Sequence, residues 1–222
     1  MTIKHYNFIE MIIDIHSHNR NDNYLTIVNK SDSNVTEIDC FSFGIHPWNS
    51  SKIEDNFLNF ENEISLIKCL AIGEIGLDKL KGPTIDVQKK VFLKQIEISE
   101  KYELPIILHC VKSWNEISEI KKLLNPIQSW IYHGFNKAGI INEVLKSDIY
   151  ISIGSSIFTN IKLQKIVNLI PNDKLFLETD DSNLDIFEIY KKVSEIKKIP
   201  LTELEQNIEQ NFKRVFRKWQ SG

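Results

Sequence analysis

Five of the six histidines in this chain follow short apolar segments, at the points where buried strands would end, and two carboxylates occupy the same kind of position. The seven residues are His16, His18, His46, Glu74, His109, His133 and Asp180. Imidazole nitrogens and carboxylate oxygens are common ligands of zinc and related divalent ions. A metal ion held by such groups activates water for hydrolysis. Gathered in one place, these residues would therefore form a site for divalent metal ions, where such chemistry is possible.

His16 and His18 are separated by one residue in the segment IIDIHSHNR, residues 12–20. Side chains alternate between the two faces of a strand, so both imidazoles should project from the same face. A single buried histidine is usually a hydrogen-bonded core residue. Several imidazoles and carboxylates packed together without a metal would leave buried polar atoms unpaired, at a high energetic cost. The group as a whole therefore favours a metal cluster.

Short apolar segments alternate with amphipathic segments along the whole chain. The apolar segments predict eight strands, at residues 11–18, 24–31, 41–47, 69–78, 105–111, 129–135, 149–156 and 175–181. Apolar side chains at i, i+3 and i+4 spacing predict seven helices, at residues 53–68, 84–104, 114–124, 137–147, 161–170, 186–199 and 202–219. Thr202, with Glu205 three residues later, has the pattern of a helix N-cap.

Strand–helix alternation predicts a parallel sheet covered by helices, and eight strands with seven helices fit a compact α/β fold, the (β/α)8 TIM barrel. Only five residues separate the first two predicted strands, which is too few for a crossover helix. We therefore expect the helix between them to be missing or reduced. The carboxyl ends of the strands carry the active site in this barrel, and the seven polar residues fall at those ends.

The composition is that of an ordinary soluble globular protein, with 42% hydrophobic residues, 26% charged residues and a net charge of −3. This charge argues against a protein that holds long duplex DNA through phosphate contacts alone. No segment has the length of a membrane span and no signal peptide is evident, so we expect no membrane contact and a cytoplasmic location. The three cysteines, Cys40, Cys69 and Cys110, form no CxxC pair and predict buried, reduced thiols.

No linker, repeat or low-complexity tract divides the chain. Residues 1–10 precede a second methionine, Met11, where the periodic pattern begins. We interpret residues 1–10 as an N-terminal extension, with Met11 as an alternative start, and residues 11–222 as a single TIM-barrel domain.

Several motifs occur in an order and spacing that resemble the TatD family of metal-dependent hydrolases. They are DIHSH, GIHPW, AIGEIGLD, LPIILHCVKSW, YHGF and LFLETDD, and the match extends from Ile12 to the segment NFKRVF near the end of the chain. The resemblance implies a TIM barrel of the amidohydrolase type, and many members of this family are described as deoxyribonucleases. It also implies two, or three, divalent metal ions. His16, His18, Glu74 and Asp180 would hold one ion, and Glu74, His109 and His133 would hold another.

We therefore expect a hydrolase that cleaves the phosphodiester bonds of single-stranded DNA by a two-metal mechanism. The ions would polarise phosphoryl oxygens and lower the pKa of water, with Asp180 as the general base and Glu74 as the bridging carboxylate. Mixed nitrogen and oxygen ligands suit zinc, manganese, cobalt or nickel, and magnesium can replace them where water fills positions. We infer nucleic acid as the partner and no obligate protein partner.

Four further residues are candidates for contacts with the substrate: His46, Trp48, Lys112 and Trp114. We expect His46 to donate to the substrate phosphate and not to bind metal. Lys112 is either a phosphate contact or a solvated lysine at a helix start. The two tryptophans either stack on bases of single-stranded nucleic acid or pack in the core or rim.

Asp14 and Glu178 each lie two residues before a predicted ligand on the same strand, so they should also face inward. They either orient a ligand or hydrogen-bond to the backbone inside the barrel.

The sequence departs from the family pattern beside the expected ligands. Asp181 and Ser182 replace a small residue followed by proline, Lys79 replaces an aromatic residue, and Val111 replaces an arginine. These changes leave the metal ligands intact but widen the choice of substrate to an amide, a lactone or a carboxylic ester. A non-catalytic metal-binding barrel is a third alternative, and the retained buried imidazoles argue against it.

Overall fold

Eight parallel strands in chain order form the sheet of this protein, as the alternating pattern predicts. The computed structural model describes residues 11–30, 40–51, 57, 60–66 and 68–221, so the predicted N-terminal extension, residues 1–10, lies outside the described residues. The strands are β1 (Ile13–Ser17), β2 (Leu25–Lys30), β3 (Phe41–Phe43), β4 (Cys69–Asp78), β5 (Ile106–Val111), β6 (Trp130–Tyr132), β7 (Tyr150–Ile153) and β8 (Leu175–Leu177).

The first and last strands approach each other, so that the sheet forms a nearly closed barrel. Closure occurs just beyond the end of β8, where Ser17 and Asp180 form a parallel bridge. The amide of Asp180 donates to the carbonyl of His16, and the amide of His18 donates to the carbonyl of Asp180, both at 2.9 Å. The predicted TIM barrel is therefore confirmed, and its seam lies among three of the predicted metal ligands.

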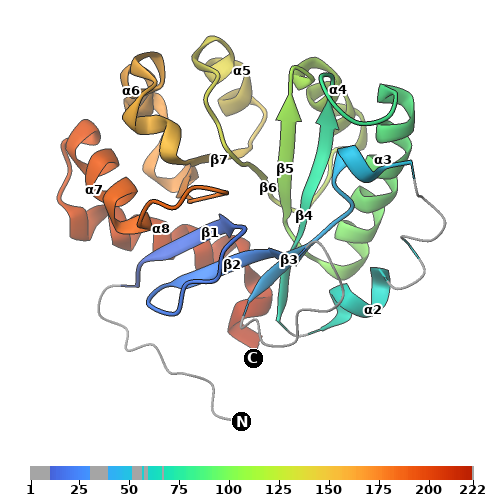
Figure 1. Cartoon of the computed structure of the whole chain (residues 1–222), viewed down its shortest axis with the longest axis horizontal. Coiled ribbons are helices and arrows are strands. Elements are labelled where there is room, and N and C mark those ends of the chain that lie inside the picture. Colours follow the sequence, from blue (N-terminus) through green and yellow to red (C-terminus); the bar gives the residue numbers. More distant parts are fainter. Residues whose placement is uncertain (1–10, 31–39, 52–56, 58–59, 67, 222) are drawn as a thin grey trace.

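The helices lie around the outside of the strands (Figure 1). They are α2 (Phe60–Ser65), α3 (Ile85–Tyr102), α4 (Trp114–Leu124), α5 (Ile141–Lys146), α6 (Ile161–Ile166), α7 (Ile186–Lys197) and α8 (Leu201–Val215). Short 3-10 helices precede α5 as η2 (Ala138–Ile140), follow β3 as η1 (Pro47–Asn49) and precede α6 as η3 (Ser155–Phe158). Each of the seven predicted helices thus has a counterpart, although part of the segment 53–68 is not among the described residues.

Two sequence-based expectations concern the ends of elements. Residues 18–24 connect β1 to β2 without a helix, as predicted. The predicted N-cap at Thr202 is wrong, because α8 begins at Leu201 and Pro200 occupies the cap position. The carbonyl of Pro200 accepts hydrogen bonds from the amides of Glu203 and Leu204, both at 3.1 Å, so the first turn already begins before Thr202.

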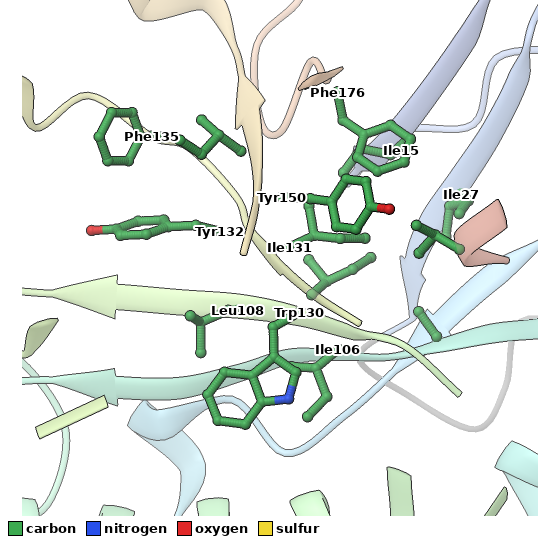
Figure 2. Packing of buried hydrophobic residues seen from close by; sticks show 14 of the residues in the cluster. Ile15, Ile27, Ile106, Leu108, Trp130, Ile131, Tyr132, Phe135, Tyr150 and Phe176 are labelled. Atoms are coloured by element: carbon green, nitrogen blue, oxygen red, sulfur yellow. The ribbon is translucent and has the colours of Figure 1, made fainter. Parts of the chain in front are cut away.

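The core on the outer face of the strands is built from large side chains that alternate with inward-facing ones (Figure 2). Trp130 of β6 is fully buried and packs against Phe92 of α3, with ring centroids 5.6 Å apart. Tyr132, two residues later, stacks on Trp114 of α4. Because side chains alternate, the same register turns Ile131 and His133 toward the barrel interior.

Cys40, Cys69 and Cys110 are all buried and unbridged, which agrees with the sequence-based expectation. Among the described residues, no helix is both long enough and apolar enough to cross a membrane.

Candidate metal centre and active site

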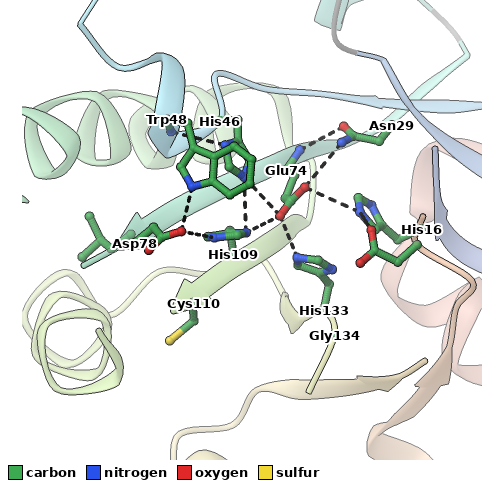
Figure 3. A network of polar contacts seen from close by, with 12 residues as sticks. His16, Asn29, His46, Trp48, Glu74, Asp78, His109, Cys110, His133 and Gly134 are labelled. Atoms are coloured by element: carbon green, nitrogen blue, oxygen red, sulfur yellow. Dashed lines mark hydrogen bonds and ion pairs between the residues drawn. The ribbon is translucent and has the colours of Figure 1, made fainter. Parts of the chain in front are cut away.

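Glu74 lies at the centre of the polar residues gathered inside the carboxyl end of the barrel (Figure 3). Its Oε1 lies 2.7 Å from Nε2 of His133 and 3.4 Å from Nε2 of His46. Nδ1 of His109 also contacts this oxygen. The second oxygen, Oε2, lies 3.7 Å from Nε2 of His16. One carboxylate therefore faces imidazoles from four different segments of the chain.

Asp180 and His18, the remaining two predicted ligands, belong to the same network. Oδ1 of Asp180 lies 3.5 Å from Nε2 of His16 and 3.4 Å from Nε2 of His18. His16 thus stands between the two carboxylates, Asp180 and Glu74. All six residues predicted as metal ligands converge at one end of the barrel.

An irregularity in β4 presents Glu74 to this site. Ile72 pairs with Ile106 of β5 and Ile75 pairs with Leu108, so three steps on β4 match two steps on β5. The extra residue forms a bulge at the Gly73–Glu74 peptide, which is cis. A bulge re-aims the side chain at its position, and here it points the Glu74 carboxylate at the imidazoles although Glu74 lies mid-strand and not at the strand end.

Gly76 allows β4 to lie close to the main chain of His109. Its φ of +148° is rarely adopted by other residues, and an added Cβ would lie 2.0 Å from the carbonyl oxygen of His109. A side chain at this position would push β5 away and would separate His109 from Glu74.

The site is closed on one side and open on the other. His16, Glu74, His109 and His133 are buried, whereas the side chains of His18 and Asp180 are 44% and 35% exposed. Water and substrate can therefore reach the site from the side of Asp180 and His18.

Charge complementarity keeps the carboxylates ionised in spite of their burial. Burial opposes ionisation of Glu74, yet the imidazoles of His133 and His109 hold its pKa well below the usual range. Burial likewise disfavours the imidazolium of His133, but Glu74 and Glu178 outweigh it and raise the pKa of His133 well above its ordinary value. Burial also opposes ionisation of Asp180, but the neighbouring imidazoles of His16 and His18 outweigh it and lower the pKa of Asp180. Carboxylate oxygens and imidazole nitrogens are ligands that divalent cations bind, and a cation that binds here would displace the proton from His133.

His16 provides a test of whether these residues fit a metal. Its side chain is fully buried, and neither ring nitrogen forms a hydrogen bond with a residue that the structure describes. An unpaired buried nitrogen costs about 1–3 kcal/mol. Three overlapping groups of described residues have ligand atoms within 4.8 Å of one another: His16, His133 and Asp180; His16, His18 and Glu74; and His46, Glu74 and His109. The residues present therefore fit divalent ions.

The sequence-based hypothesis predicted that His46 donates to the substrate phosphate and does not bind metal. His46 lies in the loop after β3, accepts a hydrogen bond from the amide of Trp48 through Nδ1 at 3.2 Å, and directs Nε2 at Glu74. It shares a potential ligand group with Glu74 and His109. The geometry therefore suits a metal ligand at least as well as a phosphate donor.

The sequence left two alternatives for Asp14 and Glu178. Asp14 hydrogen-bonds to the backbone inside the barrel, whereas Glu178 contacts a predicted ligand. Asp14 accepts hydrogen bonds from the amide and hydroxyl of Thr179, at 3.1 and 2.6 Å, and from the amide of His16 at 3.3 Å. Burial raises the pKa of Asp14 to about 7, although the contacts with Thr179 oppose this rise. Glu178 lies 3.4 Å from Nδ1 of His133 and accepts the amide of Gly134 at 2.5 Å, so it orients a predicted ligand.

Two further polar residues touch the site and escaped the sequence-based hypothesis. Asp78, the last residue of β4, lies 3.3 Å from Nε2 of His109 and accepts the indole N–H of Trp48 at 2.7 Å. Asn29 of β2 accepts the amide of Glu74 at 3.2 Å and lies 3.5 Å from its Oε2. The spacing of two between Glu74, Gly76 and Asp78 was the signal that could have identified Asp78.

Of the four residues predicted to contact substrate, His46 and Trp48 lie at the candidate site, whereas Lys112 and Trp114 line a neighbouring pocket. Trp48 lies beside the site, is 43% exposed and places its ring edge-to-face with His46 at 4.6 Å. Trp114 is 6% exposed, stacks on Tyr132 and donates its indole N–H to Glu143 at 3.2 Å. These contacts support the packing alternative for Trp114. Lys112 is exposed and lines a neighbouring pocket together with Trp114.

A family comparison agrees with this geometry. Residues 3–217 match the sequence profile of the family described as "TatD related DNase". The chain belongs to the TatD family. Because the members are metal-dependent hydrolases, this TatD-family chain is an enzyme, and the alternative of a non-catalytic barrel is set aside.

Relatives of this TatD-family hydrolase include the "Uncharacterized metal-dependent hydrolase YabD" of Bacillus subtilis, which is 31% identical over 79% of this chain and 76% of its own length. The "3'-5' ssDNA/RNA exonuclease TatD" of a Rahnella species is 28% identical over 62% of this chain and 55% of its own length. The fold is similar to the crystal structure of the TatD homologue YJJV from Escherichia coli, with a TM-score of 0.80, 20% identity and coverage of 95% and 99% of the two chains.

Proposed function

We propose that this TatD-family hydrolase cleaves phosphodiester bonds in single-stranded nucleic acid, with DNA as the expected substrate, and uses two divalent ions. One observation carries the proposal: potential metal-binding side chains surround a single carboxylate, Glu74, and the buried His16 among them lacks a hydrogen-bond partner among the described residues. Two similar proteins are named "Deoxyribonuclease Tat-D", in Schizosaccharomyces pombe, and "3'-5' ssDNA/RNA exonuclease TatD", in a Rahnella species.

We assign these residues to two ion sites that share Glu74. His16, His18 and Asp180 would hold one ion on the open side, and His109 and His133 would hold the other on the buried side, with His46 at its edge. When bound, the two ions would supply Lewis acidity toward a phosphoryl oxygen and a lowered pKa for water.

The protein residues would perform the remaining tasks. Asp180 is the carboxylate nearest the solvent-accessible side, so we assign it the proton taken from the attacking water. Its main chain is hydrogen-bonded to the end of β1 through both its amide and its carbonyl, which fixes the carboxylate relative to His16 and His18. Trp48 offers an exposed aromatic ring at the rim, where a base of a single strand can stack.

Purified protein, stripped of metal and reconstituted separately with zinc, manganese, cobalt, nickel and magnesium, tests the proposal. The substrates are end-labelled single-stranded DNA and RNA, a matched DNA duplex, and a panel of carboxylic esters, lactones and amides. We expect metal-dependent shortening of single-stranded DNA and no cleavage after chelation. Hydrolysis of an ester, lactone or amide without cleavage of nucleic acid would overturn the proposal in favour of the alternative substrates.

A further inference from the structure

A pocket of about 520 Å³ lies beside the candidate active site, between the carboxyl ends of β5 and β6 and the segments that follow them. Three lysines and three asparagines contribute most of its polar groups: Lys112, Lys137, Lys162, Asn115, Asn136 and Asn160. Cys110, Trp114 and Tyr132 form part of its apolar wall. The lining thus combines an apolar base with a cationic and amide-bearing rim.

The three lysines of this pocket form no ion pair with a described carboxylate, and Glu143 reaches the lining only through its contact with the indole N–H of Trp114. None of the residues that line it is acidic. Lys112, Lys137 and Lys162 are all exposed, and within the described part of the chain none of the three forms an ion pair. Elsewhere on the surface, lysines such as Lys79 and Lys191 are paired with carboxylates. Three unpaired ammonium groups around one hollow attract an anion more strongly than three dispersed lysines would.

The pocket and the candidate site lie on opposite faces of the same two strand ends. Cys110 and Tyr132 both line the pocket. Cys110 directly follows His109 in the sequence, and Tyr132 directly precedes His133. Successive side chains point to opposite faces, so the two histidines face the barrel interior while Cys110 points away from them (Figure 3). Lys112 follows β5 with a φ of +52°, at the turn that leads from the strand into α4.

Hydrogen bonds of Asn160 hold two segments of the pocket rim together. Asn160 donates through Nδ2 to the carbonyl of Asn136 at 3.2 Å and accepts the amide of Leu163 at 3.1 Å. These bonds tie the segment after β7, which bears Lys162, to the loop after β6, which bears Lys137. The two lysines are therefore held on segments that are fixed relative to each other.

We propose that this pocket, hereafter the lysine pocket, binds a non-scissile phosphate of the nucleic-acid strand whose scissile phosphodiester lies at the metal centre. The inference rests on the proposed function, because it assumes a strand with several phosphates as substrate. Lys112, Lys137 and Lys162 supply the charge, and the rim asparagines supply amide hydrogen bonds to phosphate and sugar oxygens. The protein has no overall basic bias, so a local cluster of this kind is how a net charge of −3 can be reconciled with a polyanionic substrate.

The test measures binding without catalysis. A fluorescein-labelled hexathymidylate is titrated by anisotropy against protein in EDTA, which prevents cleavage and removes the contribution of bound ions. The double variant Lys137→Ala/Lys162→Ala is compared with Lys146→Ala/Lys165→Ala. Lys146 and Lys165 are exposed lysines on α5 and α6 that do not line the pocket, so both variants lose the same charge from neighbouring elements.

For single strands, the slope of log association constant against log salt falls by about 0.7 for each phosphate that the protein no longer neutralises. Because one phosphate is lost, we expect the Lys137/Lys162 variant to lose about 0.7 from the slope and to bind about 8-fold more weakly at about 50 mM salt. The Lys146/Lys165 variant should retain the wild-type slope. Equal losses in the two variants, or no binding by the wild-type protein at low salt, would overturn the inference.

A competition arm with thymidine 5′-monophosphate separates a strand from a single phosphate. The hexamer should bind more tightly than the mononucleotide, and equal affinities with equal sensitivity to Lys137→Ala/Lys162→Ala would overturn the strand assignment. Cleavage of the hexamer by metal-loaded wild-type protein tests the proposed function separately. Cleavage with unchanged slopes in all variants would overturn only the lysine pocket, whereas altered slopes without any cleavage would overturn only the nuclease assignment.

Discussion

His16 and Asp180 are joined twice, although they are far apart in the chain: the amide of Asp180 donates to the carbonyl of His16 at 2.9 Å, and Nε2 of His16 lies 3.5 Å from Oδ1 of Asp180. The same hydrogen bonds that close the barrel between β8 and β1 thus hold two predicted metal ligands at a set distance. The barrel cannot close without bringing these ligands together, because the hydrogen bonds at its seam are made by the ligand residues themselves.

Replacing Asp180 with asparagine tests its role as general base. Asp180→Asn keeps the backbone bonds to β1 but removes the proton acceptor, so kcat on single-stranded DNA should fall about 100- to 10,000-fold. KM should change far less, and steady-state kinetics separate the two. Circular dichroism and metal content of the variant serve as controls. A fall in kcat/KM that comes entirely from KM would contradict the assignment.

Glu74 is predicted to bridge the two ions. Glu74→Gln should weaken both sites together, because a neutral amide is a poor ligand between two dications. Metal content after dialysis, measured by mass spectrometry, should fall toward zero together with turnover. His18→Ala is the matched comparison, since His18 contacts Asp180 and should affect one site only. Two tightly bound ions per chain in Glu74→Gln would show that the bridge lies elsewhere.

Removing metal should lower the thermal stability of the fold. Nε2 of the buried His16 has no hydrogen-bond partner among the described residues, so an ion that binds this nitrogen stabilises only the folded state. Metal at about 100 times its Kd should add about 2.7 kcal/mol to the free energy of unfolding. Differential scanning calorimetry with and without EDTA measures this change. An identical Tm in both conditions would argue against a metal at His16.

Asp78 is predicted to position His109 and not to bind metal itself. Asp78→Ala removes the carboxylate that lies 3.3 Å from Nε2 of His109, and metal affinity should weaken about 10- to 100-fold. Trp48→Phe removes the indole N–H that donates to the same carboxylate but leaves the carboxylate beside His109, so its effect should be smaller. Isothermal titration of metal-free protein compares the two variants. Equal affinity in Asp78→Ala and wild type would assign Asp78 a purely structural role.

Tyr190 provides a test of the fold apart from the site. Its buried hydroxyl donates to the carbonyl of Ile13 at 2.9 Å and accepts the amide of Ile13 at 3.1 Å, which attaches β1 to α7. Tyr190→Phe leaves both backbone groups without this partner and should lower the free energy of unfolding by about 1–3 kcal/mol. Urea denaturation measures the loss. Tyr102→Phe, which removes a contact with the exposed Glu61, should cost much less.

Local sequence patterns were sufficient for the order and type of the elements. The apolar segments and the i, i+3, i+4 spacing predicted eight strands and seven helices, because burial of one face imposes its period on each segment. The short interval after His18 predicted the missing helix, since chain length limits a crossover. Five of the six ligand candidates also followed from their places near strand ends, because parallel strands in a barrel direct their carboxyl ends to one face. Glu74 lies mid-strand, so this reason does not place it.

Tertiary structure alone decided which groups meet at close range. Asn29 and Asp78 touch the site because β2, β4 and β5 pack in one register, and the bulge in β4 that turns Glu74 inward leaves no local signature. The sequence left Trp114 open to either base stacking or packing, and its contact with Tyr132 buries it. Lys112, Lys137 and Lys162 come together only where three segments of the chain converge. Contacts between side chains on separate elements depend on how those elements pack, and periodicity within one element carries no information about that packing.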